Sequence, residues 1–553
     1  MPIHDHLKFL ELTDFTPGLY EESAVSQLDM PANAFTKLNN YVPLPQGGLR
    51  AMYAISGTLA QTGIAKAACE TATGVFVYPF SADRAGAATN CPDVLLTTIS
   101  IDDDKVRLYR MDGSNEDTKW TCNYYSVGDK GTGVGPTSFA PTCIGVGIDG
   151  TGGELCYAIV MRGVGTDEAT YSNSSGAGLY FMQYTPGCTG SNPATGDGVL
   201  TAGGLVNGAS TQCTDWQGPL LINQDRIILA DGYTIHFSDQ DANTFGENTE
   251  SGSGLVIPSS ANGTSDKLVG AVAFSPADMI FIREGSPAIE VQGDISGFSA
   301  PVVIRDMATG RFGRHVQQDM IRVPDGAVFI EPGGKIFLTD GNTFAPLSDA
   351  IPPFPSLVDI GQSSETVTGI TSVGRMDFLN GFLFAPHGFV LNYETKSWFK
   401  IADNTAFHYA DPYSGRMWYV TAGADFEVKN MLLYQGDSGI RVSCAEVQTA
   451  PFTDSSGDDV IIREVQVGLL AYGSSTSCVC VNVVDEDGNL LVARSVGGIS
   501  AGEHLIPFLF PHPRSTYLKV DIIALADNGA DEAPTIEKLR IGFDKGNKIV
   551  GLK

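Results

Sequence analysis

Pairs of short apolar runs, separated by Gly, Asp or Asn turns, recur along most of this chain and limit the folds that it can adopt. Clear examples are RIILADGYTIHFSD (226–239), MIFIREGSPAIEVQGD (279–294) and AVFIEPGGKIFLTDGNTF (327–344). Each pair is typical of a β-hairpin. From Ile228 onward the units recur about every 45 to 55 residues, which is close to the period of a propeller blade.

A single four-stranded blade cannot bury its own faces, so repetition around an axis is the stable arrangement. We therefore predict an all-β chain with a multi-bladed β-propeller of about six to eight blades over residues 51–440. The earlier hairpin units are longer and less regular than the later ones. Their Gly/Ser/Thr-rich insertions around residues 113–220 are expected on the rim of the propeller.

The pattern changes after Gly439, where strands alternate strictly between apolar and polar residues. One such run is Leu518, Lys519, Val520, Asp521 and Ile522. A good hairpin turn, Asp487-Gly488, lies between two further strands. This texture predicts a C-terminal β-sandwich-like domain over residues 441–553. Residues 1–50 are expected to form an extended N-terminal segment without a core of its own.

The charge balance of the chain disfavours a protein that binds nucleic acid tightly. The 553 residues include 63 Asp and Glu against 34 Lys and Arg, for a formal net charge of −29. Such an excess repels DNA phosphates at short range, although a ring could surround DNA without gripping it. No window approaches the roughly 18 to 20 apolar residues that a membrane span needs. The N-terminus also lacks the basic start and apolar run of a signal peptide, so we expect synthesis and assembly in a cytoplasm.

The stretch DQDANTFGENTE (239–250) is the nearest match to a metal site. Positions 1, 3, 5, 9 and 12 of a would-be EF-hand loop carry oxygen ligands: Asp239, Asp241, Asn243, Glu247 and Glu250. Position 6, where the loop needs Gly, is Thr244, and no helical pattern flanks the stretch. A solvated turn between strands is therefore favoured over a calcium site.

The ending of that stretch recurs in TDGNTF (339–344), as expected of a structural turn between blades. This second turn resembles the Asp-box of sialidase propellers in its residue types: Thr339, Asp340, Gly341, Thr343 and Phe344. Asp-boxes stabilise blades and do no chemistry. A sialidase would also need an arginine cluster and a Tyr/Glu nucleophile pair at the axis, so a propeller glycoside hydrolase remains a minor alternative.

Other motif matches lack the context that their chemistry requires. The GxGxxG match at Gly145–Gly150 continues as turn and strand rather than as the helix of a dinucleotide site. No two of the eight histidines have the i, i+4 spacing of a helical metal site, and SGSG (251–254) lacks the strand-to-helix setting of a nucleophile elbow. We therefore predict no catalytic, cofactor-binding or metal-binding residues, no cofactor, and no enzymatic activity.

Acidic clusters and cysteines also have structural interpretations. The clusters IDDD (101–104), SSGDD (455–459) and DEDG (485–488) fall at predicted turns, where solvated loop tips are expected. Cys478 and Cys480 share a strand face, and the ten cysteines are irregularly spaced. Buried free thiols are therefore favoured over a disulfide scaffold or a zinc site.

The N-terminal stretch DFTPGLYEESAVSQLDMPANAFTKLNNYVPLPQGGLRAMYA resembles the tail nozzle and head-to-tail stabilisation (connector) proteins of short-tailed bacteriophages. The residues that carry this resemblance are Phe15, Gly18, Leu19, Leu28, Ala34, Phe35, Leu38 and Asn39, with GGLRAM before the first blade. The propeller hairpins also resemble those of this family in their residue pattern, at Asp231-Gly232, Phe237-Ser238-Asp239, Phe281–Arg283 and Ile289–Gly293.

The resemblance implies a structural virion protein of the tail, assembled in the host cytoplasm as a homohexameric ring below the portal and adaptor rings. Such a ring would retain packaged double-stranded DNA and give it a channel for ejection. Together with the net charge, it predicts a lumen lined more by Asp and Glu than by Lys and Arg. One alternative is a minor tail or baseplate propeller protein that binds host glycans, and the glycoside hydrolase is another.

Overall fold

The computed structural model describes the parts of the chain that form its sheets. The described residues are 8–21, 30–55, 64–65, 70–78, 93–100, 105–111, 139–148, 155–163, 179–185, 199–205, 220–223, 226–231, 234–237, 254–256, 268–275, 277–283, 288–293, 303–306, 320–330, 334–340, 343–354, 376–401, 405–411, 415–421, 425–426, 428–433, 441–453, 459–472, 476–526 and 532–545. Within them, the regular elements are β-strands, apart from the 3₁₀ turn η4 (Pro386–Gly388). The predicted all-β class is confirmed.

Seven small antiparallel sheets follow one another through the middle of the chain. The first four contain β6 (Glu70–Tyr78), β7 (Asp93–Ser100) and β8 (Lys105–Met111); β9 (Phe139–Ile148), β10 (Leu155–Gly163), β11 (Leu179–Thr185) and β12 (Val199–Leu205); β13 (Leu220–Asn223), β14 (Arg226–Asp231), β15 (Thr234–Phe237) and β16 (Gly254–Val256); and β17 (Leu268–Ser275), β18 (Asp278–Arg283), β19 (Ile289–Gln292) and β20 (Val303–Asp306). The last three contain β21 (Ile321–Val323), β22 (Gly326–Ile330), β23 (Ile336–Thr339) and β24 (Phe344–Pro346); β25 (Asp377–Leu379), β26 (Phe382–Phe384), β27 (Phe389–Asn392) and β28 (Ser397–Lys400); and β29 (Thr405–Asp411), β30 (Arg416–Thr421) and β32 (Val428–Leu432).

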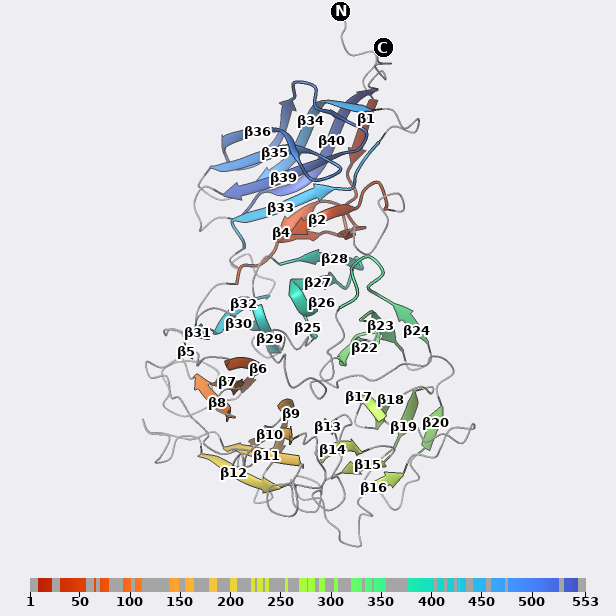
Figure 1. Cartoon of the computed structure of the whole chain (residues 1–553), viewed down its shortest axis with the longest axis vertical. Coiled ribbons are helices and arrows are strands. Elements are labelled where there is room, and N and C mark those ends of the chain that lie inside the picture. The colour runs from red at the N-terminus through yellow and green to blue at the C-terminus, as the bar shows by residue number, and fades with distance from the viewer. Residues whose placement is uncertain are drawn as a thin grey trace, which may run out of the picture.

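These sheets close into a ring. The first strand of each sheet contacts the first strand of the next, from β6 through β9, β13, β17, β21 and β25 to β29, and β29 returns to β6. Figure 1 shows the seven sheets around a common centre. The middle of the chain is therefore a seven-bladed β-propeller, within the predicted range of blades.

The chain enters and leaves the propeller at one place. Tyr53, before the first blade, forms an antiparallel bridge with Arg441, after the last blade. Nearby, β5 (Ile64–Ala65) pairs with β31 (Asp425–Phe426). Backbone pairing between segments from the two ends of the propeller thus helps to close the ring.

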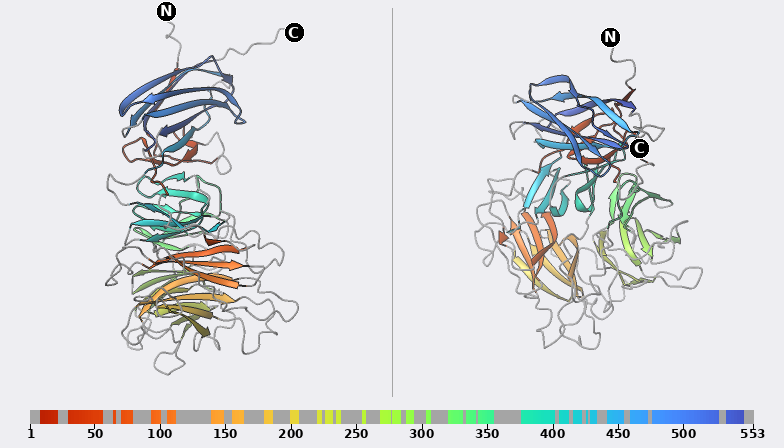
Figure 2. Two further views of the ribbon diagram at one scale, coloured as in Figure 1. Left: turned by 90° about the vertical axis from the view of Figure 1, so that its left-hand side faces the viewer. Right: turned by 45° about the horizontal axis from the view of Figure 1, so that its top comes forward.

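Both ends of the chain build a β-sandwich. One sheet contains β3 (Tyr41–Pro43), β4 (Leu49–Ala51), β40 (Thr535–Lys545), β34 (Val460–Ala471) and β37 (Gly502–Leu509), with β1 (Lys8–Leu12) on β40 and β38 (Arg514–Ser515) on β34. The other contains β2 (Phe35–Asn39), β33 (Cys444–Thr449), β39 (Leu518–Ala526), β35 (Ser477–Asp485) and β36 (Leu490–Ile499). Both views of Figure 2 place this sandwich at one side of the propeller.

Alternation along the strands builds the sandwich core, because successive residues of a strand face opposite sides. Val447, Val481 and Val520 from one sheet share a buried cluster with Val465 and Leu539 from the other. The expected hairpin at Asp487-Gly488 is present: the Gly488 N–H donates to the Asp485 carbonyl at 3.1 Å, and Gly488 has φ +81°. The β-sandwich expected from the C-terminal pattern is present, but strands β1 to β4 of the N-terminal segment also belong to its two sheets.

The N-terminal segment buries its apolar side chains in this shared core. Phe15, Leu19, Phe35 and Leu38 are almost fully buried, and the Phe15 and Phe35 rings lie 5.5 Å apart. The segment has no separate core of its own. It supplies β1 to one sheet and β2 to the other, and β2 also reaches the propeller.

A blade and the sandwich share one continuous sheet. Strand β28, the outer strand of the sixth blade, pairs with β2 in parallel at Asn39 and Lys400, and β2 pairs antiparallel with β33. The backbone N–H of Asn40 donates to the Lys400 carbonyl at 2.7 Å. The two bodies are therefore joined by backbone hydrogen bonds as well as by the chain crossings.

Candidate functional site

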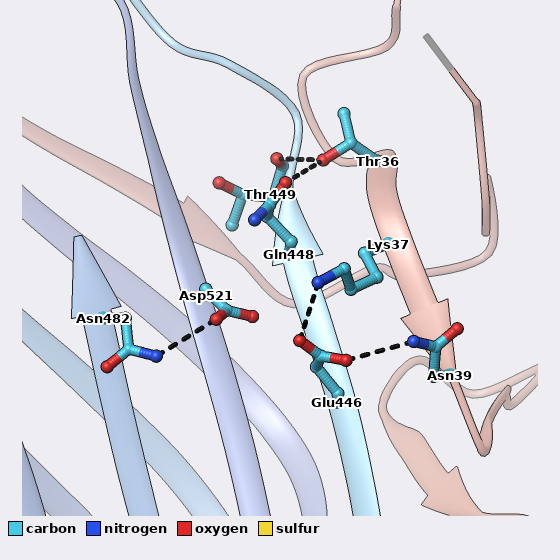
Figure 3. Close-up of polar contacts among 8 residues, drawn as sticks. All are labelled: Thr36, Lys37, Asn39, Glu446, Gln448, Thr449, Asn482 and Asp521. Carbon is cyan, nitrogen blue, oxygen red and sulfur yellow. Dashed lines mark hydrogen bonds and ion pairs between the residues drawn. The ribbon is translucent and has the colours of Figure 1, made fainter. Parts of the chain in front are cut away.

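A polar network crosses the sandwich sheet where β2 joins it (Figure 3). The Lys37 ammonium contacts Glu446 Oε1 at 2.9 Å, and Asn39 Nδ2 donates to Glu446 Oε2 at 3.1 Å. At the next position along the strands, Thr36 Oγ1 donates to Gln448 Oε1 at 2.9 Å. Side chains of the N-terminal strand are thus paired with side chains of β33.

A buried carboxylate, Asp521 on β39, lies on the strand beside β33. Asp521 is 7% exposed, and its Oδ2 accepts from Asn482 Nδ2 at 3.1 Å. Burial raises the pKa of Asp521 above its ordinary value, and the neighbouring Glu446 carboxylate raises that pKa further. Glu446 and Asp521 lie on the adjacent strands β33 and β39, and each accepts a hydrogen bond from a side chain of a neighbouring strand. These contacts fit a structural role.

Sequence reasoning missed this network for a clear reason. The alternation of β39 places Asp521 on the opposite face from Val520 and Ile522, but it does not say which strand lies beside that face. Lys37 and Glu446 are separated by 409 residues. The only available signal was the run of polar residues at every second position in β2 and β33.

A second feature is a cleft between the sandwich and the propeller, where the chain crosses from one to the other. It encloses about 490 Å³. Eight polar or aromatic side chains lie in its wall: Arg50, Tyr53, Asn380, Phe382, Asn392, Glu394, Arg441 and Glu532. A volume of this size lies in the range of small-molecule sites.

Two guanidinium groups in the cleft face one carboxylate. Arg441 Nε lies 3.2 Å from Glu532 Oε2, and Arg50 Nη2 lies 3.6 Å from Glu532 Oε1. Arg441 also stacks over the Tyr53 ring at 4.1 Å and donates to the Ala51 carbonyl at 2.5 Å. Burial lowers the pKa of Arg441 from its ordinary value, and the nearby Arg50 lowers that pKa further. The wall of the cleft therefore carries two arginines and two glutamates, in a chain that is strongly acidic.

A third feature is the edge of the sandwich formed by β36 and β37. These consecutive strands end the two sheets, so each has one backbone edge unpaired by any other described strand. Leu490, Leu505 and Leu509 are 60%, 59% and 69% exposed there, and Leu491 is also exposed. We call these four residues the leucine edge. Exposed apolar side chains on unpaired strands are typical of contact surfaces.

The motifs singled out in the sequence fall in different places. The calcium-like stretch 239–250 lies outside the described residues, as do residues 101–104. In the Asp-box-like turn, Asp340 Oδ1 accepts from the Thr343 N–H at 2.7 Å and from Thr343 Oγ1 at 3.1 Å. That carboxylate therefore holds the turn between β23 and β24. Gly145–Ile148 of the GxGxxG match lie inside β9, and the next described element is the strand β10.

The last acidic cluster is a capped turn. Asp485 Oδ1 accepts from the backbone N–H groups of Asp487 and Asn489 at 3.1 and 2.8 Å. Hydrogen bonds from Asn489, followed by those from the backbone, lower the pKa of Asp485. Its carboxylate thus has a structural use at the hairpin.

Three cysteines have described side chains, and these three thiols form no disulfide with one another. Cys478 and Cys480 are half-buried on β35, whereas Cys444 is exposed on β33. The expected burial is therefore wrong for Cys444, because the first residue of β33 lies on the outer face of the sheet. Within the described ranges, no three His, Cys, Asp or Glu side chains come together as a metal site. No helix in those ranges is long and apolar enough to span a membrane.

The fold defines the class of this protein as a seven-bladed propeller with a β-sandwich built from both ends of the chain. No family model matches the sequence, and no curated protein is similar to it. Among solved structures, the exo-β-1,3-galactanase from Phanerochaete chrysosporium with bound galactose covers 87% of this chain and 100% of its own, at 10% identity and TM-score 0.26.

Two further solved structures are similar at the same level. YCF48 from Cyanidioschyzon merolae covers 68% of this chain and 98% of its own, at 10% identity and TM-score 0.32. Raptor from Chaetomium thermophilum covers 69% of this chain and 29% of its own, at 10% identity and TM-score 0.35. These values do not transfer an activity, and the propeller assignment depends on the closed ring of sheets.

Proposed function

We propose that this chain is a structural virion protein of a phage tail. It forms a ring-shaped nozzle or connector below the portal and adaptor, retains packaged DNA, and provides the channel for genome ejection. The observation that supports this proposal most is the leucine edge, which offers apolar side chains and unpaired strands on a rigid body. A ring of identical subunits needs such a surface on every copy.

The coupling between sandwich and propeller supports the same role. A nozzle must hold its shape while DNA passes, so the two bodies of each subunit should not move freely. The shared sheet through Asn39 and Lys400 supplies this stiffness. The net charge of −29 lets the ring enclose DNA without binding it, and the lumen is lined more by Asp and Glu than by Lys and Arg.

The proposed protein is a non-enzyme. The two carboxyl groups of the Figure 3 network, Glu446 and Asp521, are bonded to Lys37, Asn39 and Asn482. The contacts of Lys37 and Asn39 with Glu446 stabilise the pairing of β2 with β33. A glycoside hydrolase would instead hold two acids on either side of a sugar-binding cleft.

The experiment is sedimentation velocity of the purified chain, alone and mixed with portal–adaptor complexes from the same virion. A nozzle subunit joins the complexes as six copies. A glycan-binding tail protein would leave the complexes unchanged and would instead bind the host surface. Turnover of a panel of glycosides would favour the hydrolase and contradict the proposal.

A further inference from the structure

The cleft at the chain crossing has properties that the nozzle role does not require. It lies where β4, the segment after the last blade and the segment before β40 meet, so its walls come from parts of the chain far apart in sequence. It is also the place where two arginines face one carboxylate.

The two arginines have different bonding. Arg441 is 12% exposed at its side chain and has close partners in Glu532, the Ala51 carbonyl and the Tyr53 ring. Its bonds hold the exit of the propeller to the entry, which explains its presence. Arg441 is therefore a structural residue of the crossing.

Arg50 has much weaker partners. Its Nη2 lies 3.6 Å from Glu532 Oε1, beyond the usual length of a hydrogen bond, and its guanidinium lies 5.6 Å from the Tyr472 ring. Its Nε is buried and has no hydrogen-bond acceptor in the protein. Because this nitrogen has almost no accessible surface, a ligand in the cleft would contact the two Nη groups of Arg50, whose side chain is 35% exposed.

The inner wall of the cleft has one more positive than negative side chain. Glu532 is one carboxylate between two guanidinium groups, and it already lies close to Arg441. The other acidic residue in the wall, Glu394, is exposed. Asn392 donates to the Pro43 carbonyl at 2.9 Å and accepts from the Glu394 N–H at 3.1 Å, so this amide serves the fold. Arg50 remains as the group with unused donors.

We propose that this cleft binds a small oxyanion ligand, with a carboxylate or phosphate group placed against the guanidinium of Arg50. The planar guanidinium matches such groups through two parallel hydrogen bonds. The volume of about 490 Å³ exceeds that of a single oxyanion, and apolar wall residues such as Leu44 and Phe382 can contact the rest of the ligand. Glu532 limits the affinity, because it competes for the same charge.

The test is isothermal titration of the full chain with succinate and, separately, with inorganic phosphate, at constant ionic strength set by sodium chloride. Saturable binding of at least one anion is expected, and the stronger of the two identifies the preferred chemistry. Arg50→Gln should weaken that binding at least about 10-fold, which corresponds to about 1.4 kcal/mol. Arg514→Gln is the matched control, because Arg514 is a sandwich arginine that contacts Asp459 at 2.6 Å and does not line the cleft.

A second variant keeps the test decisive if Arg50→Gln does not fold. Glu532→Gln removes the competing carboxylate, so the preferred anion should raise the melting temperature of this variant more than that of the wild type. Absence of saturable binding by both anions, equal affinity in Arg50→Gln and the wild type, or an equal melting shift in Glu532→Gln would each overturn the proposal.

Discussion

Asn39 on β2 pairs in parallel with Lys400 on β28, so a propeller blade and the sandwich form one continuous sheet. The N-terminal segment makes a second backbone contact with β28: the Leu19 N–H donates to the Trp398 carbonyl at 2.8 Å. Motion of the sandwich relative to this blade would break backbone hydrogen bonds. The junction is therefore expected to be among the stiffest parts of the chain.

Gly18 tests this junction. It has φ +70°, and a Cβ at this position would lie 2.8 Å from both Ser397 Cβ and the Trp398 carbonyl oxygen. Gly18→Ala should lower the free energy of unfolding by about 2–4 kcal/mol, from backbone strain and from the clash together. Gly381→Ala is the control, because Gly381 has φ +84° but no atom within 4 Å of its Cβ position. Urea unfolding measures both variants, and equal losses would contradict the close approach.

Asp521 should make the free energy of unfolding decrease as pH rises, which is the opposite of the usual effect of a carboxylate. Its pKa is raised by burial and by Glu446, so its contribution is complete below the ordinary pKa of an aspartate and is lost as pH rises through the raised value. Asp521→Asn carries the neutral form at every pH. Its stability relative to the wild type should therefore increase as pH rises, as measured by urea unfolding at about pH 5 and about pH 8.

Asp485→Asn provides a control of opposite sign. The pKa of Asp485 is lowered by hydrogen bonds to its carboxylate, so its contribution is present above the ordinary pKa and is lost as pH falls through the lowered value. This variant should be less stable than the wild type at both pH values. The same trend in both variants would show that the Figure 3 network does not bury a carboxyl group as described.

The hairpins and the sandwich could be predicted from the sequence because their signals are local. Alternation in Leu518–Ile522 and the Asp487-Gly488 turn act over a few residues, and the blade period repeats along the chain. The pairing of β2 with β28 and β33 could not be predicted, because alternation fixes which face a residue takes but not which distant strand lies beside it. The meeting of Arg50 with Glu532 is likewise a product of long-range pairing.

Loss of Glu532 should weaken the crossing between the two bodies. Glu532→Gln leaves Arg50 and Arg441 facing each other without a carboxylate, and both ion-pair partners Arg441 and Glu532 are more than four-fifths buried. The expected loss is about 1–3 kcal/mol of unfolding free energy, the cost of leaving buried donors without their acceptor. Lys335→Gln is the control: its contact with Asp349 at 3.0 Å is half exposed, and its loss should cost less than about 1 kcal/mol. Similar losses in the two variants would argue against a buried cluster.

The leucine edge should matter for assembly and not for folding. Leu505→Ser with Leu509→Ser changes two exposed side chains on one face of β37, so the melting temperature should change little. Joining of the portal–adaptor complexes should fall by about 10-fold or more if these residues lie in the centre of a subunit contact. Glu503→Gln, on the same strand, should leave the joining of the portal–adaptor complexes unchanged. If the double variant assembles as fully as the wild type, the leucine edge is not part of the subunit contact.

The most direct measurement is a cryo-electron microscopy map of the virion tail that carries this protein. We predict six copies in a ring on the tail axis, below the portal and adaptor, with the leucine edge of each copy against its neighbour. Density for the protein at the periphery of the tail, or outside the virion altogether, would contradict the proposed function.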